Sequence, residues 1–385
     1  MASLTDRLAR AFSVARSGKP TVSRHVNHVQ AYVPTSSLTS IEARPYQTPF
    51  KLDWNESTIP PSPAVADAIQ AHLSGAHHLN WYPEVSCSTL RGAISEYVGH
   101  DPAGILVTNG SDDALDLLCR TYLDEGDEIV LPVPTYTHFE VFAGARGGRM
   151  VPVRSTDPLE KNIGGVLAAL GARTKLVYLV SPTNPTGIVY TEADVRAILA
   201  EAPQAVVIVD EAYHEFCGYS VAHLTREFEN LVVTRTFSKS FGIAGLRVGY
   251  AIASPALIGD LLRLYNPKSV NALGQVAACA ALGDLQHLND YVASVRVGME
   301  MMQDFFGAHG IPCHSTPANF VLISMSDASG FAAALAEVGV YVRDWSGVEQ
   351  MEHLVRISVG TAEQTEEVLR RVAHTLERRP SLLAN

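Results

Sequence analysis

Residues 236–250 read TFSKSFGIAGLRVGY, and this stretch decides the fold. An apolar, β-branched run at 231–234 enters it and a second strand-like run at 248–253 leaves it, so Lys239 is predicted on a loop at a strand end. The loop also carries two serines beside the lysine, and Arg247 follows eight residues later. One amine, two hydroxyls and a fork-shaped cation are the groups needed to hold a phosphate monoester beside a Schiff base. A solvated loop lysine is the alternative.

Short apolar runs alternate with helical segments on both sides of this loop. Segments with helical spacing, such as 112–123 and 192–202, separate most of the runs. This alternation predicts an α/β fold in which a mostly parallel sheet of seven strands is sandwiched by helices. The predicted strands are 105–107, 128–133, 150–153, 176–180, 205–209, 231–236 and 248–253. Active residues are then expected at the strand ends, where such sheets bind ligands.

The chain divides into three predicted parts. With 385 residues, 47% of them hydrophobic, it can bury a large core, and its length favours two domains. Beyond residue 265, a long helical stretch at 285–306 precedes shorter strands and helices, which is typical of a smaller α+β domain. We predict an N-terminal arm over 1–45 that packs with the small domain or a partner subunit, a large domain over 46–265 and a small C-terminal domain over 266–385.

Two polar residues follow predicted strands of the large domain. Asp210 comes directly after the run 205–209, and a carboxylate there needs a cationic partner, which a ligand or a structural arginine could supply. Asn184 lies between two prolines in SPTNPTG, residues 181–187, and these prolines hold its amide in a fixed turn. A purely turn-forming asparagine is the alternative.

The segment TNGSDD, residues 108–113, joins the first predicted strand to a helix. Backbone N–H groups at the start of that helix, with the Ser111 hydroxyl, are suited to bind a phosphate. Ser111 and Asp112 could equally form an ordinary helix cap.

Together these segments resemble a known family. Ser-Lys at 238–239 with Gly-Leu-Arg-Val-Gly at 245–249, Asn-Pro-x-Gly at 184–187 and Asp-x-x-Tyr at 210–213 resemble fold-type I aminotransferases of class I and II, which depend on pyridoxal 5′-phosphate. The resemblance is closest to the histidinol-phosphate aminotransferase group. It implies exchange of an amino group between an amino acid or a histidinol-phosphate-like amino-alcohol phosphate and a 2-oxo acid.

The resemblance implies a role for each residue around the cofactor. Lys239 would hold the cofactor covalently and move the substrate's α-proton, and Asp210 would keep the ring nitrogen protonated. Asn184 and Tyr213 would hydrogen-bond the phenolic oxygen, so Lys239, Asp210 and Tyr213 form the implied catalytic set. Tyr136 would stack on the ring, although an aromatic residue after a strand is more often part of the core. The phosphate would be bound by Gly110, Ser111, Asp112, Ser238 and Arg247, and by Tyr82 of the partner subunit in a homodimer with shared active sites.

Two arginines resemble the substrate-binding residues of the family. Arg356 stands at the position of the arginine that binds the substrate carboxylate, with bidentate geometry that lysine could not supply. Arg343, thirteen residues earlier, would bind the other end of the substrate together with Tyr32. A salt bridge of Arg343 with Asp344 or Glu349 is the alternative.

The segments on the substrate side depart from the family pattern. NESTIPP, residues 55–61, stands where the family shows Asn-Glu-Asn-Pro-x-Gly-Pro, and AYVPT, residues 31–35, stands where it shows Pro-Tyr-x-Pro-Gly. Asn55 is expected on this substrate side. Because these segments lie on the substrate side, the departures do not affect the prediction of the cofactor, but they leave the identity of the substrate open.

Three functions compete on this scaffold. The first is an aminotransferase for histidinol phosphate or a related compound, including one in a specialised biosynthetic pathway. The second is a lyase or decarboxylase of the phosphothreonine-decarboxylase kind, which shares these motifs and would release carbon dioxide without needing a keto acid. The third is a regulatory protein that keeps the cofactor. The N-terminal arm shows no recognisable helix-turn-helix, which argues against this function.

Composition argues against several other classes of protein. A net charge of -11 with no basic stripe argues against a nucleic-acid or anionic membrane surface. No apolar run approaches the roughly 18 to 20 residues that would span a bilayer. The five cysteines lack C-x-x-C spacing, so neither a metal site nor a disulfide framework is predicted, and a reducing cytoplasm is the simplest setting.

Overall fold

The computed structural model describes residues 20–27, 41, 49–75 and 79–383. Tyr32 and most of the predicted N-terminal arm lie outside the described residues. Within the described part, no helix combines the length and the apolar character needed to cross a membrane.

A seven-stranded sheet forms the centre of the larger unit. Its strands, in spatial order, are β2 (Ile105–Thr108), β8 (Gly249–Ala253), β7 (Leu231–Thr236), β6 (Val206–Asp210), β5 (Thr174–Val180), β3 (Glu128–Val133) and β4 (Arg149–Arg154). Only β8 runs against its neighbours; β7, β6, β5, β3 and β4 pair in parallel. The predicted α/β fold with a mostly parallel sheet is confirmed.

Both faces of this sheet are buried, because its central strands are apolar at most positions. Successive residues of a strand point to opposite faces. Val207 and Val209 of β6 therefore enter one hydrophobic core, and Val206 and Ile208 enter the other. This explains why these strands appear in the sequence as continuous apolar runs, without alternation.

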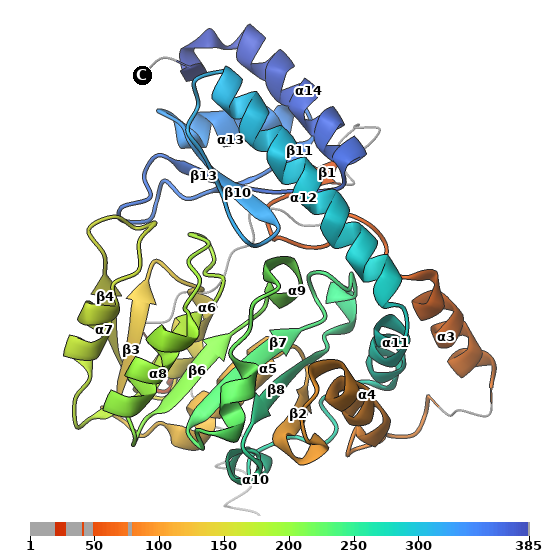
Figure 1. Cartoon of the computed structure of the whole chain (residues 1–385), viewed down its shortest axis with the longest axis vertical. Coiled ribbons are helices and arrows are strands. Elements are labelled where there is room, and N and C mark those ends of the chain that lie inside the picture. The colour runs from red at the N-terminus through yellow and green to blue at the C-terminus, as the bar shows by residue number, and fades with distance from the viewer. Residues whose placement is uncertain (1–19, 28–40, 42–48, 76–78, 384–385) are drawn as a thin grey trace, which may run out of the picture.

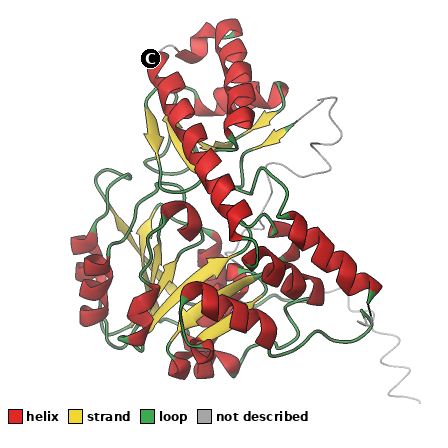
Figure 2. Ribbon diagram, turned by 45° about the vertical axis from the view of Figure 1, so that its right-hand side comes forward, coloured by secondary structure: helices red, strands yellow, loops and turns green. Residues whose placement is uncertain are grey.

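Helices cover the two faces in two layers, as Figure 2 shows. One core contains residues of α5 (Ser111–Tyr122), α6 (His138–Gly144) and α10 (Pro255–Leu262). The other contains residues of α4 (Ser88–Val98), α7 (Ile163–Ala169), α8 (Glu192–Glu201), α9 (His214–Cys217) and α11 (Ala272–Leu282), and α3 (Pro63–Ser74) packs against α11. Short 3₁₀ turns lie at Pro102–Gly104, Ala222–Arg226, Ala244–Leu246 and Pro380–Leu383.

The smaller unit lies above the main sheet in Figure 1. Its antiparallel sheet has the order β12 (Arg343–Asp344), β13 (Leu354–Ser358), β10 (Phe320–Ser324) and β9 (Cys313–Ser315). The helices of this unit are α12 (Leu285–Ala308), α13 (Ala328–Glu337) and α14 (Ala362–Arg378). Helix α12 runs from this unit down to α11 and α3. The residue ranges of the three predicted parts stay a prediction.

An early segment of the chain packs with this later unit. Strand β1 (Phe50–Lys51) pairs in parallel with β11 (Val340–Tyr341), and Ser358 N–H donates to the Leu52 carbonyl at 3.0 Å. The residues that follow β1 are thereby placed between the two units, above the ends of the parallel strands.

Candidate active site

Lys239 lies on the loop that follows β7, as the sequence predicts. Its Nζ donates a hydrogen bond to the Trp54 carbonyl at 2.8 Å and lies 6.0 Å from the centre of the Tyr213 ring. Burial, followed by the nearby charge of Arg356, lowers the pKa of this amine to about 8. The next residue fixes the loop, because the Ser240 hydroxyl donates to Glu215 at 2.9 Å. The amine is therefore held in place and is easily deprotonated.

Asp210 forms the buried end of β6 and has 3% of its surface exposed. The Tyr178 hydroxyl donates to its Oδ2 at 3.0 Å, while Oδ1 has no hydrogen-bond partner within the described residues. Burial raises the pKa of this carboxyl group to about 6. A buried carboxylate oxygen without a partner fits a ligand that brings a positively charged N–H group to it.

The sequence analysis missed Tyr178, which supports this carboxylate. It lies inside the apolar strand β5, and Val180 of that strand is the register partner of Asp210. Tyr178, two residues earlier, points to the same face of the sheet, and Phe139 stacks on its ring at 3.9 Å between centres. A single hydroxyl inside an otherwise apolar buried strand is the signal that could have identified it, because such a group needs a partner.

Two polar side chains lie beside the amine. Tyr213 is buried, and its hydroxyl accepts a hydrogen bond from Asn55 Nδ2 at 3.0 Å. Asn184 follows β5, and its Oδ1 accepts from the guanidinium of Arg356. Burial raises the pKa of the Tyr213 hydroxyl, so this group is neutral and able to donate a proton in a hydrogen bond.

A cup for an anion lies at the start of α5. Gly110 precedes the helix with φ +84°, and a Cβ there would lie 2.6 Å from Arg247 Nη2, so only glycine fits. Arg247 donates to Ser238 Oγ at 3.3 Å and to Asp112 Oδ2 at 3.2 Å. Asp112 also accepts from the Tyr136 hydroxyl at 3.0 Å. Helix N–H groups beside a guanidinium and a serine hydroxyl fit a phosphate.

Arg343 and Arg356 are neighbours on the smaller sheet. They are register partners across β12 and β13, and their guanidinium carbons lie 5.8 Å and 5.9 Å from the centre of the Trp345 ring. Arg356 is 4% exposed and donates to the carbonyl of Asp53 and to Asn184. Two cations beside one aromatic ring make a site suited to anions.

Two predicted site residues, Asn55 and Tyr82, have surroundings that differ from those expected. Asn55, expected on the substrate side, has no exposed surface and supports Tyr213. Tyr82 is 75% exposed, with Lys268 Nζ 4.4 Å from its ring centre. Tyr32 lies outside the described residues. Among the described residues, no group of histidine, cysteine and carboxylate side chains is arranged to bind a metal ion.

The residues present fit pyridoxal 5′-phosphate. Asp210 Oδ1 offers an acceptor to a protonated ring nitrogen, and the cup at Gly110 and Arg247 offers donors to a phosphate. Lys239 supplies an amine whose pKa is lowered, the Tyr213 ring centre lies 6.0 Å from that amine, and Asn184 adds an amide that contacts Arg356.

Comparisons with known proteins agree with this fit. The model of the family "Aminotransferase class I and II" matches residues 48–372. The chain is 36% identical over 356 residues to histidinol-phosphate aminotransferase from Methanosarcina mazei, which covers 91% of this chain and 95% of that protein. It is 37% identical over 334 residues to a dihydroxyacetone phosphate transaminase from Campylobacter jejuni, covering 84% of this chain and 89% of that protein.

A solved structure shares the fold. The crystal structure of histidinol-phosphate aminotransferase from Sinorhizobium meliloti in complex with pyridoxal 5′-phosphate has a TM-score of 0.84 at 24% sequence identity, and the match covers 94% of this chain and 99% of that chain. The fold and the site define an enzyme that depends on pyridoxal 5′-phosphate. The chain belongs to the class I and II aminotransferase family, and it is an aminotransferase.

Proposed function

We propose that this aminotransferase takes its amino group from a small phosphorylated amino compound, of the histidinol-phosphate kind, and passes it to a 2-oxo acid. The adjacent pair Arg343 and Arg356 carries this proposal. Two guanidinium groups side by side match a dianionic phosphate better than a single carboxylate, because each can form two parallel hydrogen bonds to anionic oxygens. A 2-oxo acid with a second carboxylate could occupy the same pair in the return reaction.

Relatives support the choice of a phosphorylated substrate. The similar proteins from Methanosarcina mazei and Campylobacter jejuni are named for histidinol phosphate and dihydroxyacetone phosphate. The two compounds differ in their carbon skeletons and share a phosphate ester. The shared group is what a pair of arginines recognises.

The chain's own residues divide the remaining work. When bound, pyridoxal phosphate withdraws electrons from the substrate's α-carbon, which makes the proton there removable. Lys239 Nζ accepts that proton and delivers it elsewhere as general base and acid, a role suited to an amine whose pKa is lowered to about 8. Asp210 would hold the ring nitrogen in its protonated form, and Tyr213 and Asn184 would donate to the phenolic oxygen.

We further propose that the enzyme is a cytoplasmic homodimer. Leu79, Trp81 and Tyr82 leave 59%, 69% and 75% of their surface exposed in one connected segment before α4. An exposed apolar segment of this kind is typical of an interface between proteins. The second copy of the chain is the occupant that gives Tyr82 its predicted contact with the phosphate of the partner site. The five cysteines form no disulfide, in agreement with a reducing compartment.

A half-reaction screen tests the substrate. The holoenzyme is mixed with L-histidinol phosphate, L-histidinol, L-histidine or L-glutamate, and the loss of the cofactor's visible absorbance is followed. We expect the phosphorylated amine to react with at least about tenfold higher kcat/KM than its dephosphorylated form, because two charge-assisted contacts are lost without the phosphate. Equal reaction of histidinol and histidinol phosphate would contradict the proposal.

A variant of the arginine pair sharpens this test. Arg343→Gln should raise KM for the phosphorylated amine far more than for histidinol. Arg154→Gln is the matched control, because Arg154 ends β4 of the main sheet and forms an exposed ion pair with Glu349 at 2.8 Å. Release of carbon dioxide in place of a keto product would instead favour a decarboxylase.

A further inference from the structure

Three consecutive residues each contact a different side chain of the site. The Asp53 carbonyl accepts from Arg356, the Trp54 carbonyl accepts from Lys239, and Asn55 donates to Tyr213. No regular helix or strand includes them, since they follow the short strand β1. We call residues 53–55 the bridging segment.

Asn55 gives the bridging segment its shape. It has φ +55°, in the left-handed region, which costs most residues roughly 1 kcal/mol or more and which asparagine adopts at a smaller cost. Its backbone N–H donates to Ser358 Oγ at 3.0 Å, its Oδ1 accepts from the same hydroxyl at 2.7 Å, and its carbonyl accepts from Asn319 at 3.2 Å. A conformation of this cost persists only where surrounding contacts enforce it, and here they enforce it beside reactive side chains.

The peptide plane between residues 54 and 55 links this conformation to the lysine. In a trans peptide the C=O and the N–H point in opposite directions. Because the Asn55 N–H is directed to Ser358, the Trp54 carbonyl is directed the other way, and there it accepts from Lys239 Nζ at 2.8 Å. The backbone angle of one residue thus sets the position of the acceptor for the amine.

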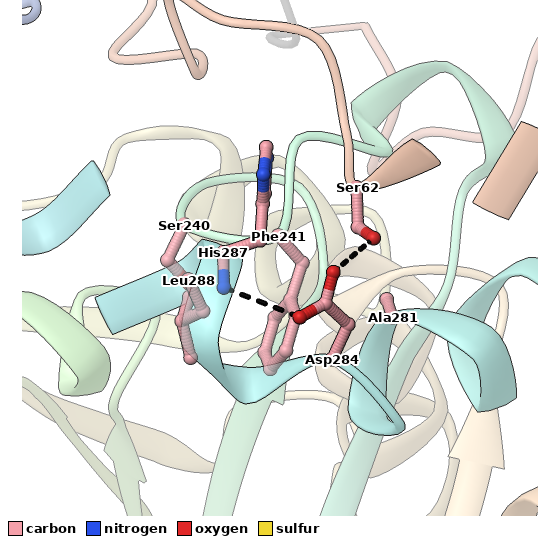
Figure 3. A pocket seen from close by; sticks show the side chains of 7 residues that line it. All are labelled: Ser62, Ser240, Phe241, Ala281, Asp284, His287 and Leu288. Atoms are coloured by element: carbon pink, nitrogen blue, oxygen red, sulfur yellow. Dashed lines mark hydrogen bonds between the residues drawn. The ribbon is translucent and has the colours of Figure 1, made fainter. Parts of the chain in front are cut away.

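The chain beyond the bridging segment is held as well. Thr58 N–H donates to the Tyr291 hydroxyl at 3.1 Å, and the Ser62 hydroxyl donates to Asp284 at 2.5 Å. Figure 3 shows Ser62 beside Asp284 and His287 at the start of α12, and His287 Nε2 lies 3.2 Å from the Pro60 carbonyl. These contacts fix the exit of the segment, so Asn55 cannot relax by a shift of the whole loop.

We propose that Asn55 is a positioning residue for the aminotransferase reaction, in place of the substrate contact implied by resemblance. Its left-handed backbone directs the Trp54 carbonyl to the amine of Lys239 whenever that amine is free of the cofactor. Its amide holds the hydroxyl of Tyr213. The second half of the proposal rests on the cofactor role proposed above for Tyr213.

Substitutions at position 55 separate the backbone role from the side-chain role. Asn55→Gly keeps a positive φ at no steric cost and loses the amide, whereas Asn55→Ala loses the amide and also disfavours the left-handed conformation. The first measurement is a pH titration of the holoenzyme, followed by its visible absorption, which gives the pH at the midpoint of the spectral change. The second is the rate at which the apoprotein takes up pyridoxal phosphate, which requires a correctly placed Lys239 and no turnover.

Each variant has a distinct expected result. Asn55→Gly should move the pH midpoint in the same direction as Tyr213→Phe, by about 1 pH unit, because a hydrogen bond that favours one charge state is weakened. Its rate of cofactor uptake should stay near that of the wild type. Asn55→Ala should move the midpoint equally and also slow uptake about fivefold, the factor that corresponds to roughly 1 kcal/mol of backbone cost.

Controls separate this proposal from a general loss of stability. Asn55→Gly combined with Tyr213→Phe should move the midpoint no further than Tyr213→Phe alone. Gly310→Ala places a comparable backbone penalty at φ +70°, between α12 and β9, where no atom lies within 4 Å of an added Cβ, and should leave the midpoint and the uptake rate unchanged. Asn55→Ser carries a similar backbone penalty and replaces Asn55→Ala if that variant does not fold.

The contradicting outcomes are also distinct. Equal uptake rates for Asn55→Gly and Asn55→Ala would overturn the backbone half of the proposal. A midpoint that moves in Tyr213→Phe and stays fixed in Asn55→Gly would overturn the side-chain half. A midpoint that stays fixed in Tyr213→Phe itself would overturn the role of Tyr213, and with it the side-chain half, while leaving the substrate proposal untouched.

Discussion

Burial shifts the two central titratable side chains toward their neutral forms. The pKa of Asp210 rises to about 6, and that of Lys239 falls to about 8, in both cases chiefly because burial disfavours the charged form. Between these values, the apoprotein holds a carboxylate and an ammonium group at a cost in stability. Bound pyridoxal phosphate would remove that cost, because Asp210 would then face a positively charged N–H group and Lys239 would no longer be a free ammonium group.

The first prediction concerns Asp210→Asn. A carboxyl group whose folded pKa is raised destabilises the fold progressively as pH rises from its ordinary pKa of 3.8 to about 6, and by a constant amount above that. The neutral amide removes this penalty, so the apoprotein variant should be more stable than the wild type at pH 8 by about 3 kcal/mol, and no more stable near pH 4. Urea unfolding of both apoproteins at the two pH values checks this, and aminotransferase activity should be largely lost. A difference that is the same at both pH values would contradict it.

The second prediction concerns Tyr178→Phe, which removes the hydroxyl that donates to Asp210 Oδ2. A hydrogen bond to a charged group contributes about 1.5 to 3 kcal/mol, so the carboxylate should be harder to ionise and cofactor affinity should fall about tenfold or more. Equilibrium binding of pyridoxal phosphate to the apoprotein measures the effect. Tyr122→Phe is the matched control, because it also removes a hydroxyl bonded to an aspartate, Asp260 at 3.4 Å, on the surface. Equal losses in both variants would contradict the assigned role of Tyr178.

At the scale of the elements, the start of α5 and the loop after β7 build the phosphate cup together. Where these two segments meet, a side chain on Gly110 would clash, because an added Cβ would lie 2.6 Å from Arg247 Nη2. The flexible arginine has to move if that space is filled, and the helix N–H groups then face the ligand without their partner cation.

The third prediction follows from that contact. Gly110→Ala should lower the affinity for pyridoxal phosphate more than about tenfold, because it displaces Arg247 and disfavours φ +84°. Gly99→Ala is the control, since Gly99 has φ +63° and no atom within 4 Å of an added Cβ. That control should lose about 1 kcal/mol of stability and keep its affinity. If both variants lose affinity alike, backbone strain and not the filled cup is responsible.

The sequence predicts these elements well where its pattern is regular. The runs at 128–133 and 231–236 appear as β3 and β7 with the predicted ends, because strands buried on both faces are rich in apolar residues. By contrast, β11 and β12 belong to different sheets although a single residue separates them in the chain. A change of sheet within a few residues leaves no periodic signal.

The contacts of the bridging segment could not be predicted from the sequence either, and the reason is a different one. Asp53 and Trp54 act through backbone carbonyls, which every residue type carries, so their side chains give no indication of the contacts. Tyr178 is hidden for a related reason, since its hydroxyl lies within an apolar strand. By contrast Asp210, Lys239 and Arg247 are charged residues at strand ends and loops, where burial of charge requires a partner, and the sequence places them correctly at those ends.

At the scale of the whole molecule, both units contribute to the site. Asp210 ends β6 of the main sheet and Lys239 lies on the loop after β7, whereas Arg343 and Arg356 come from the smaller sheet, which lies above the main sheet in Figure 1. The bridging segment pairs with the smaller unit and contacts the lysine of the larger one. Displacement of one unit against the other would therefore move the anion-binding arginines relative to the amine.

The fourth prediction concerns the proposed dimer. Lys239→Ala and Tyr82→Ala should each be poorly active alone, and after unfolding and refolding as an equal mixture they should recover up to about a quarter of wild-type activity. Random pairing makes half of the dimers mixed, and each mixed dimer has one site with both residues intact. Sedimentation should give twice the chain mass of 41.5 kDa. Failure of the mixture to exceed its components would contradict a Tyr82 shared between subunits.

The antiparallel direction of β8 limits where a circularly permuted form of this enzyme could place its new termini. Because β8 returns antiparallel directly after β7, a single connection at 237–248 carries both the reactive amine and the guanidinium of the phosphate cup. A circularly permuted chain with new termini between Lys239 and Arg247 would keep every strand of the sheet. It would nevertheless break the covalent link between the amine and the guanidinium, so we expect new termini on the opposite rim of the sheet to preserve activity better.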